Sequence, residues 1–223
     1  MTEPLVITID GPAGAGKSTV AQMLATRLGL IYVDSGATYR ATALKVLETG
    51  IDPLDEPAVA KLIAGTEVRL TTCDGAPHVL VDGNDVTARL RTPEVTLAAA
   101  QVSRLPEVRA KLIEMQRSFA RHPGVVMEGR DIGTVVFPHA KFKIFLKADM
   151  EVRARRRLKQ DSHDSSAATI EKTAYEIGRR YQLDSERKIS PLKPANDAVE
   201  IDSTNLLADQ VVEQILELIG KTA

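Results

Sequence analysis

The N-terminal part of the chain alternates between short apolar runs and one stretch with helical spacing. Leu5–Ile9 is an apolar run rich in β-branched residues, which predicts a strand buried on both faces. From Val20 the apolar residues recur at helical spacing, and Gly29 stands where a helix C-cap belongs. A second apolar run, Leu30–Val33, follows. A strand, a helix and a strand within about thirty residues predict a βαβ unit, whose crossover implies a parallel sheet.

The stretch between Glu67 and Thr87 has a different pattern. Its apolar and polar residues alternate with the period of a strand, and it contains two hairpin signals, Asp74-Gly75 and Asp82-Gly83-Asn84. We therefore expect a small antiparallel meander inserted into an otherwise α/β chain.

The α/β pattern resumes after this insertion. We expect a helix over Pro106 to Arg121, core strands at Val125–Met127, Phe142–Leu146 and Val199–Ile201, and a last helix with an apolar stripe at Leu207, Val211, Ile215 and Leu218. Residues 151–188 are rich in charge and in helix formers. They predict surface helices around a mobile excursion near Ser162 to Ala168.

Composition narrows the class of protein. The chain has 223 residues, 43% of them hydrophobic and 26% charged, which is typical of a globular protein with a substantial core. Its net charge of −1 argues against nucleic-acid or anionic-membrane partners, which require an excess of positive charge. The single cysteine, Cys73, excludes an intramolecular disulfide and a cysteine-rich zinc site. Since we find neither a signal-peptide pattern nor a membrane-length apolar run, we expect a cytoplasmic enzyme or regulator.

One motif is highly specific: a complete G-x-x-x-x-G-K-[ST] phosphate-binding loop, or P-loop, follows the first strand. At average residue frequencies, a chain of this length matches it by accident roughly once in a hundred. Lys17 is expected to reach the β- and γ-phosphates of ATP, and the Ser18 hydroxyl to bind Mg²⁺. The expected nucleotide-binding residues are Gly11, Pro12, Ala13, Gly14, Ala15, Gly16, Lys17, Ser18 and Thr19.

P-loops occur in switch GTPases, in motor or regulatory ATPases and in small-molecule kinases. The first class is disfavoured, because neither D-x-x-G nor N-K-x-D occurs anywhere in the sequence. A small-molecule kinase needs a second, anion-binding site, which holds the acceptor and neutralises the charge of the transferring group. Twelve of the 17 arginines lie between Arg104 and Arg187, and arginine suits bidentate phosphate contacts.

Three short motifs are candidates for that second site. The string from Asp34 to Arg40 follows the second strand, at the carboxyl edge where open α/β sheets bind ligands. Gly129-Arg130-Asp131 follows another predicted strand. The spacing of Arg180, Asp184 and Arg187 predicts that all three share one face of a helix.

The residues alone do not decide which acceptor a kinase with this core would use, or whether the protein is catalytic at all. The same core can serve a kinase with another acceptor, such as UMP, AMP or a small alcohol. A non-catalytic regulator can also bind ATP as a conformational ligand.

The strings GPAGAGKST, DSGATYR, EGRDIGTVVFP, KIFL and DSTNL are spread along nearly the whole chain. Together they resemble the bacterial cytidylate kinase family. The resemblance implies transfer of the γ-phosphoryl group of ATP to CMP or dCMP, with Mg²⁺, giving CDP or dCDP and ADP. It also implies an α/β fold: a P-loop parallel sheet flanked by helices, with a β-rich acceptor-binding insertion and a short helical lid. The expected core is residues 1–62, 104–150 and 189–223, the expected insertion is residues 63–103, and the lid with its flanking helices is residues 151–188.

The resemblance also implies roles for individual residues. The implied acceptor-binding residues are Ser35, Arg40, Arg109, Arg130, Asp131, Arg180, Asp184 and Arg187. The implied catalytic residues are Lys17, Arg130, Arg157 and Arg187, with Arg157 coming from the lid. Ala100 stands where the family often has a serine that contacts the base. Arg155 is expected to point away from Arg153 and Arg157 on one helix.

The expected chemistry needs no protein nucleophile, because a phosphate oxygen of CMP attacks the γ-phosphorus in line. Glu128 or Asp10 is expected to hold Mg²⁺ through water, or to be structural. The substrates are then two small nucleotides, and we expect a monomer without nucleic-acid or membrane partners.

Overall fold

The computed structural model describes residues 4–73, 76–160 and 166–221. It divides into two compact units. The first comprises Met1–Tyr32 and Phe119–Ala223, and the second comprises Val33–Ser118.

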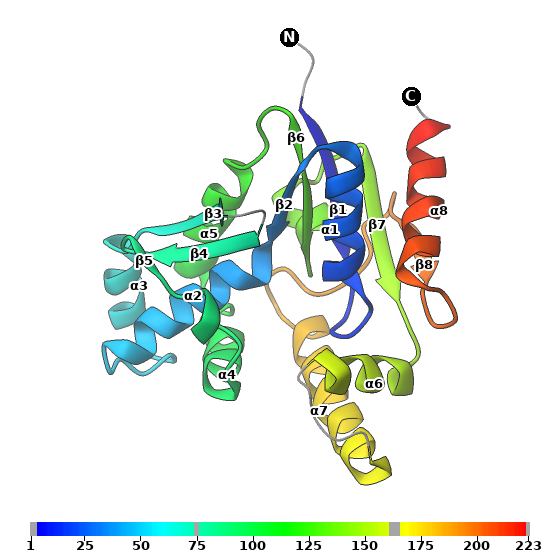
Figure 1. The fold of residues 1–223 in the computed structure, drawn as a ribbon. Coiled ribbons are helices and arrows are strands. Elements are labelled where there is room, and N and C mark those ends of the chain that lie inside the picture. Colours follow the sequence, from blue (N-terminus) through cyan, green and yellow to red (C-terminus); the bar gives the residue numbers. More distant parts are fainter. Residues whose placement is uncertain (1–3, 74–75, 161–165, 222–223) are drawn as a thin grey trace. The chain divides into compact units, whose positions relative to one another are not determined.

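The first unit contains the predicted parallel sheet apart from its residues 33 and 34 (Figure 1). Its strands are β1 (Leu5–Asp10), β2 (Ile31–Asp34), β6 (Gly124–Gly129), β7 (Phe142–Lys147) and β8 (Val199–Asp202), in the order β2-β6-β1-β7-β8. β1 is parallel to both β6 and β7, and β7 is parallel to β8. β1 is largely apolar and β-branched, and all six residues of β6 are buried, as expected of central strands covered on both faces.

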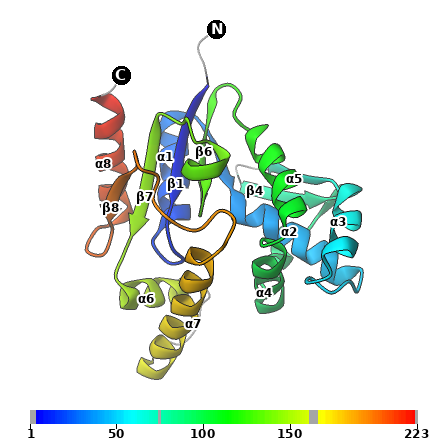
Figure 2. The same ribbon diagram turned by 180° about the vertical axis from the view of Figure 1, so that it is seen from behind.

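The described part of this unit has four α-helices: α1 (Lys17–Leu28), α6 (Met150–Gln160), α7 (Ala167–Ser185) and α8 (Ala208–Gly220). α1 and α8 pack on the same face of the sheet, as the views from opposite sides agree (Figures 1 and 2). Val211 and Ile215 are buried there, as the apolar stripe predicts. The expectation for Leu207 was wrong: it is the N-cap of α8 and lies exposed, because the helix begins one residue later.

The second unit contains the predicted meander. β3 (Val68–Cys73), β4 (Ala76–Val81) and β5 (Asn84–Asp85) form an antiparallel sheet in that order, and the predicted turn at Asp74-Gly75 lies outside the described residues. The other elements are α2 (Ser35–Glu48), α3 (Glu56–Ala64), the 3-10 turn η1 (Thr87–Arg89), α4 (Pro93–Val102) and α5 (Pro106–Arg117).

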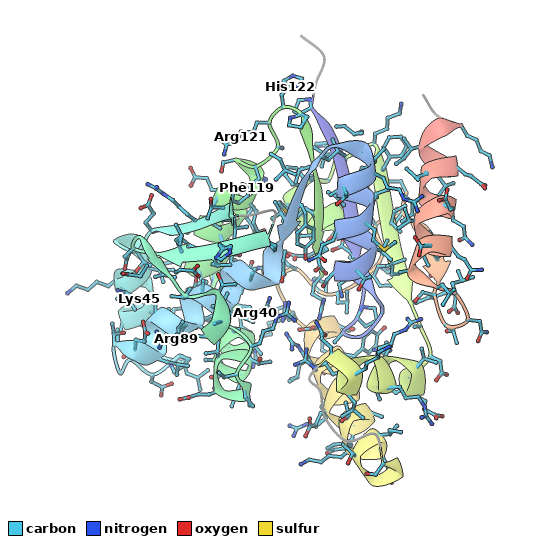
Figure 3. The ribbon with its side chains drawn as sticks, viewed as in Figure 1. Arg40, Lys45, Arg89, Phe119, Arg121 and His122 are labelled. Atoms are coloured by element: carbon cyan, nitrogen blue, oxygen red, sulfur yellow. The ribbon has the colours of Figure 1, made fainter. Side chains whose placement is uncertain are left out.

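The second unit is larger than the predicted insertion of residues 63–103. Residues from α2 pack against the meander in one buried cluster, and residues from α2, α3, α4 and α5 form another. Two ion pairs add to this packing: Lys45 of α2 with Asp82, at 2.8 Å, and Arg89 with Glu48, at 2.5 Å (Figure 3 labels Lys45 and Arg89). The helices on either side of the insertion therefore cluster with it, because they supply the core on which it packs.

Some helix boundaries differ from those expected. α3 and α4 had no sequence prediction, although Asp55 and Thr92 cap them with side-chain oxygens. The helix from Pro106 ends at Arg117 rather than Arg121, because Ser118 caps it and donates its hydroxyl proton to the carbonyl of Met115. Of the excursion expected near residues 162–168, residues 162–165 lie outside the described part, and α7 begins at Ala167.

Within the described residues no helix is long and apolar enough to cross a membrane.

Candidate active site

The P-loop has the geometry of a phosphate cradle. α1 begins at Lys17, and its N-cap is Gly16 in a left-handed conformation, with φ of 93°. α2, α3 and α4 each begin with a side chain that accepts a backbone N–H, whereas among the described residues no side chain caps α1, and its first turn has no acid. The Lys17 amine is held at the loop by donating to the carbonyl oxygen of Pro12, at 2.9 Å. The helix N-terminus and this amine together favour an anion.

A cavity of about 450 Å³ adjoins the loop. It is lined by residues 14–20 of the P-loop and α1, by the α6 residues Arg156, Lys159 and Gln160, and by residues 203, 206–208 and 211. Its volume falls in the range of small-ligand sites. The described residues lining it supply three cations and no carboxylate, which suits a polyphosphate.

Helix α6, in the stretch predicted to form the lid, is in direct contact with the P-loop. A Cβ built on Gly14 would lie 2.6 Å from the carbonyl oxygen of Arg153, and Gly14 has a φ of +78°. Only glycine satisfies both the backbone conformation and the approach of α6. Arg153 itself is buried, and its guanidinium lies 5.8 Å from the ring centre of Tyr181. Burial lowers the pKa of Arg153.

Asp10 connects the P-loop strand to the segment after β6. Its two carboxylate oxygens accept the backbone N–H groups of Ile132 (2.9 Å) and Gly133 (2.7 Å). These residues begin the one-turn π-helix η2 (Ile132–Val136), directly after Arg130 and Asp131. Burial raises the pKa of Asp10 to about 6, against the two N–H groups, which lower it. Asp10 is therefore engaged structurally, and it holds the Arg130-Asp131 turn beside β1.

The raised pKa of Asp10 predicts a pH-dependent stability. An unfolded aspartate titrates near 3.8 and folded Asp10 near 6, so between these values the folded chain binds more protons than the unfolded chain. The contribution of Asp10 is thus fully present below about pH 4 and is lost as the pH rises through 6, by about 3 kcal/mol. Urea unfolding of the wild type and Asp10→Asn, from pH 4 to 7 without nucleotide or metal, should show a difference in stability that changes across this window. A constant difference contradicts the assignment.

Asp184 gathers two of the predicted arginines. Its carboxylate is almost fully buried and accepts hydrogen bonds from Arg130 Nε, at 3.1 Å, and from the Arg187 guanidinium. The predicted position of Arg187 was wrong: it lies beyond the end of α7, which stops at Ser185, yet its side chain still reaches Asp184. Arg180 lies on α7 one turn before Asp184. Two guanidinium groups share one carboxylate, so this cluster carries net positive charge.

The motif from Asp34 to Arg40 opens α2 in the second unit. Asp34 is the N-cap: one carboxylate oxygen accepts the N–H of Ala37 and the other accepts from Arg40, at 2.7 Å. Arg40 extends from α2 and is labelled in Figure 3. Ser35, the first residue of α2, is buried. The motif is thus a capped helix start that fixes the direction of Arg40.

The side chain of Arg109 packs against helix α2. It comes from α5, is only 3% exposed, and lies with its guanidinium 5.7 Å from the ring centre of Tyr39. It also donates to the carbonyl oxygen of Ser103, at 3.3 Å. Tyr39 follows Ser35 by four positions and therefore shares its face of α2. The second unit thus brings Ser35 and Arg109 to one region of α2.

The expected site residues did not include Arg156 and Ser203, which line the P-loop cavity, or Arg153, which packs against Gly14. Arg156 lines the cavity and hydrogen-bonds to Ser203, whereas Arg157 of the same run stays a prediction. Arg155 is exposed and pairs with Glu151 at 2.6 Å, as the helical period predicts. The run of arginines on α6 indicates that some of them lie near the P-loop, but it does not indicate that these are Arg153 and Arg156.

The described residues contain no group of three His, Cys, Asp or Glu side chains that could hold a metal ion. Mg²⁺ in kinase sites is usually held by one or two protein groups together with substrate phosphates and waters, and does not require such a group. Of the two candidate carboxylates, Glu128 accepts a hydrogen bond from the Tyr32 hydroxyl at 3.0 Å, and Asp10 is held by backbone N–H groups.

Comparison with known proteins gives a consistent result. The family model for cytidylate kinase matches residues 7–221. A cytidylate kinase of Caldicellulosiruptor bescii is 46% identical over 218 residues, covering 96% of this chain and 95% of the relative. One of Symbiobacterium thermophilum is 48% identical over 225 residues, covering 99% and 98%. Among solved structures, a gluconokinase from Sinorhizobium meliloti has a TM-score of 0.51 and 13% identity, covering 100% of this chain and 95% of that one, which is a likeness of fold alone.

Proposed function

Because the chain belongs to the cytidylate kinase family, we propose that it transfers the γ-phosphoryl group of ATP to CMP or dCMP. The observation that carries this proposal is a family match from residue 7 to residue 221, which includes the P-loop and its cavity. Kinases for UMP, AMP or a small alcohol, and a non-catalytic ATP-binding regulator, are not favoured by this match.

The reaction we propose is an in-line displacement. An oxygen of the CMP phosphate forms a bond to the γ-phosphorus, the bond from that phosphorus to the β-phosphate oxygen breaks, and ADP leaves. Lys17 and the arginines neutralise the charge on the transferring group. We retain Arg130, Arg157 and Arg187 in this role. As acceptor-binding residues we retain Ser35, Arg40 and Arg109 of the second unit, and Arg130, Asp131, Arg180, Asp184 and Arg187 of the first.

Mg²⁺ is part of the proposal. The Ser18 hydroxyl is the protein ligand that the motif supplies, and a bound Mg²⁺ would neutralise charge on the β- and γ-phosphates. We assign any water-mediated role to Glu128 rather than Asp10, since both oxygens of Asp10 already accept backbone N–H groups.

We also propose that the protein acts in the cytoplasm, as a monomer, on small nucleotides without nucleic-acid or membrane partners. The support is chemical: the substrates that we propose are free nucleotides, and the cations cluster at a small cavity and around one carboxylate. Sedimentation at micromolar concentration tests the oligomeric state.

A coupled assay across nucleoside monophosphates tests the function. With ATP and Mg²⁺, CMP and dCMP should give CDP and dCDP at rates well above those with AMP. A higher rate with another acceptor would replace the proposal with a different kinase. ATP binding without turnover of any acceptor would favour the regulator instead.

Replacing Arg130 tests the acceptor assignment. Arg130→Ala removes a charged hydrogen-bond donor, so KM for CMP should rise about ten- to a hundredfold, while the affinity for ATP changes little. Arg155→Ala, at an exposed arginine, is the control and should leave both constants unchanged. Equal losses for the two nucleotides would show that Arg130 does not belong to the acceptor site.

A further inference from the structure

Ser203 joins three segments that meet at the P-loop cavity. It lies in the loop after β8 and is only 2% exposed. Its hydroxyl is 3.0 Å from the Ala15 carbonyl oxygen of the P-loop, 3.2 Å from the Lys147 carbonyl oxygen at the end of β7, and 3.0 Å from Arg156 Nη1 of α6. A hydroxyl in contact with the P-loop, the lid helix and the sheet is well placed to set their geometry.

The hydrogen-bonding capacity of a serine fixes how this hydroxyl points. It has one proton to donate and two lone pairs with which to accept. The Lys147 carbonyl already accepts the backbone N–H of Ser203, at 2.8 Å, so the nearer Ala15 carbonyl is the better acceptor for the proton. A lone pair then remains for Arg156. The P-loop carbonyl therefore orients the hydroxyl, and the hydroxyl orients the guanidinium.

Arg156 is held only by neutral oxygens. Besides the Ser203 hydroxyl, its Nη2 donates to the carbonyl oxygens of Ser203, at 2.7 Å, and of Leu206, at 3.4 Å. In the part of the chain that the structure describes, no carboxylate pairs with it. Burial lowers the pKa of Arg156, which is the cost of keeping this cation partly away from water.

The position of this cation points to the nucleotide. Arg156 lines the P-loop cavity, and its Nη1 is the nearest atom, at 3.9 Å, to a Cβ built on Gly16. Arg155 differs in both respects, since it is exposed and its charge is balanced by Glu151. The charge of a partly buried cation without a carboxylate partner is neutralised when an anion enters the cavity.

We propose that Ser203 is a positioning residue of the donor site, which holds Arg156 so that its charge faces the phosphate-bearing nucleotide in the P-loop cavity. This inference deepens the proposed function and rests on ATP binding at that cavity. If Ser203 works through Arg156, it affects the affinity for the donor ATP and not the recognition of the acceptor.

A double-mutant cycle on ATP affinity tests the proposal. The proteins are the wild type, Ser203→Ala, Arg156→Gln, the double variant, and Arg155→Gln as the matched control. ATP binding is measured by calorimetry without acceptor, and KM values for ATP and CMP are measured by the coupled assay. Thermal unfolding establishes that each variant is folded.

Arg156→Gln should weaken ATP binding about tenfold, and Ser203→Ala about three- to tenfold. KM for CMP should stay within about twofold of the wild type, and Arg155→Gln should match the wild type. Because Ser203 acts through Arg156, adding Ser203→Ala to Arg156→Gln should weaken ATP binding by less than about twofold more.

Two results would overturn the inference: Ser203→Ala with wild-type ATP affinity, or an effect of Ser203→Ala that is undiminished in the Arg156→Gln background. Failure of the proposed function is distinguishable from either, because it would appear in the wild type as ATP binding without CDP formation. Ser203→Thr keeps the hydroxyl and, as a folded protein, should bind ATP more tightly than Ser203→Ala. Equal affinities of Thr and Ala variants would count against a role for the hydroxyl.

Discussion

Replacing Lys17 with methionine should lower kcat for CDP formation by about a hundred- to a thousandfold, the loss typical of removing one preorganised donor to a charged transition state. The Lys17 side chain is buried in the P-loop, where its amine donates to the Pro12 carbonyl oxygen beside the nucleotide cavity. Methionine keeps most of the apolar stem and removes the charge, so the fold should persist. The measurement is kcat at saturating ATP and CMP, with thermal unfolding of both proteins.

Lys172→Met is the control for this prediction. Lys172 is an exposed lysine of α7, and its loss should leave kcat unchanged. A Lys17→Met enzyme that retains more than about a tenth of wild-type kcat would show that the amine does not act on the transferring group.

Replacing Asp184 with alanine should destabilise the chain by about 2–4 kcal/mol, because it leaves Arg130 and Arg187 with no shared carboxylate in a partly buried site. Asp184 is only 5% exposed, and the two guanidinium groups would face each other across the vacated position. For a chain of this size the loss corresponds to a fall in melting temperature of about 10 °C. Asp184→Asn should be intermediate, since it keeps one acceptor oxygen but no charge.

Asp209→Ala is the matched control. Asp209 pairs with Arg27 on the surface, where its side chain is 68% exposed, so its loss should cost less than about 1 kcal/mol. Urea unfolding of the three variants measures the differences. Similar losses of unfolding free energy for Asp184→Ala and Asp209→Ala would show that the Arg130–Asp184–Arg187 cluster stabilises the fold no more than a surface ion pair does.

The parts of the molecule that sequence analysis predicted well are those whose signal is local. The run Leu5–Ile9, the P-loop and the first helix follow one another without interruption, and the structure confirms their order and the parallel sheet. The meander was predicted for the same reason, since alternation and turn residues lie within one short stretch. α3 and α4 are short and had no sequence prediction, although each has a cap, at Asp55 and Thr92, and a proline and a glutamate in its first turn.

The charged run on α6 shows where local signals end. Helical spacing separates Arg155 from its neighbours, and the structure places it on the exposed face. The same spacing does not say that Arg153 packs against Gly14, or that Arg156 lines the cavity. Likewise Arg187 reaches Asp184 from outside α7, because the chain turns after Ser185.

The sequence by itself determined the P-loop, the parallel sheet and the class of chemistry, because a phosphate cradle is made by the backbone of consecutive residues and a buried strand by a short continuous apolar run. Only the tertiary structure decided which cations surround that cradle and what holds them. Ser203 and Ala15 are 188 positions apart, and Arg156 and Ser203 are 47 apart. Contacts at such separations exist only after the helices and strands have packed, so no local pattern of residues encodes them.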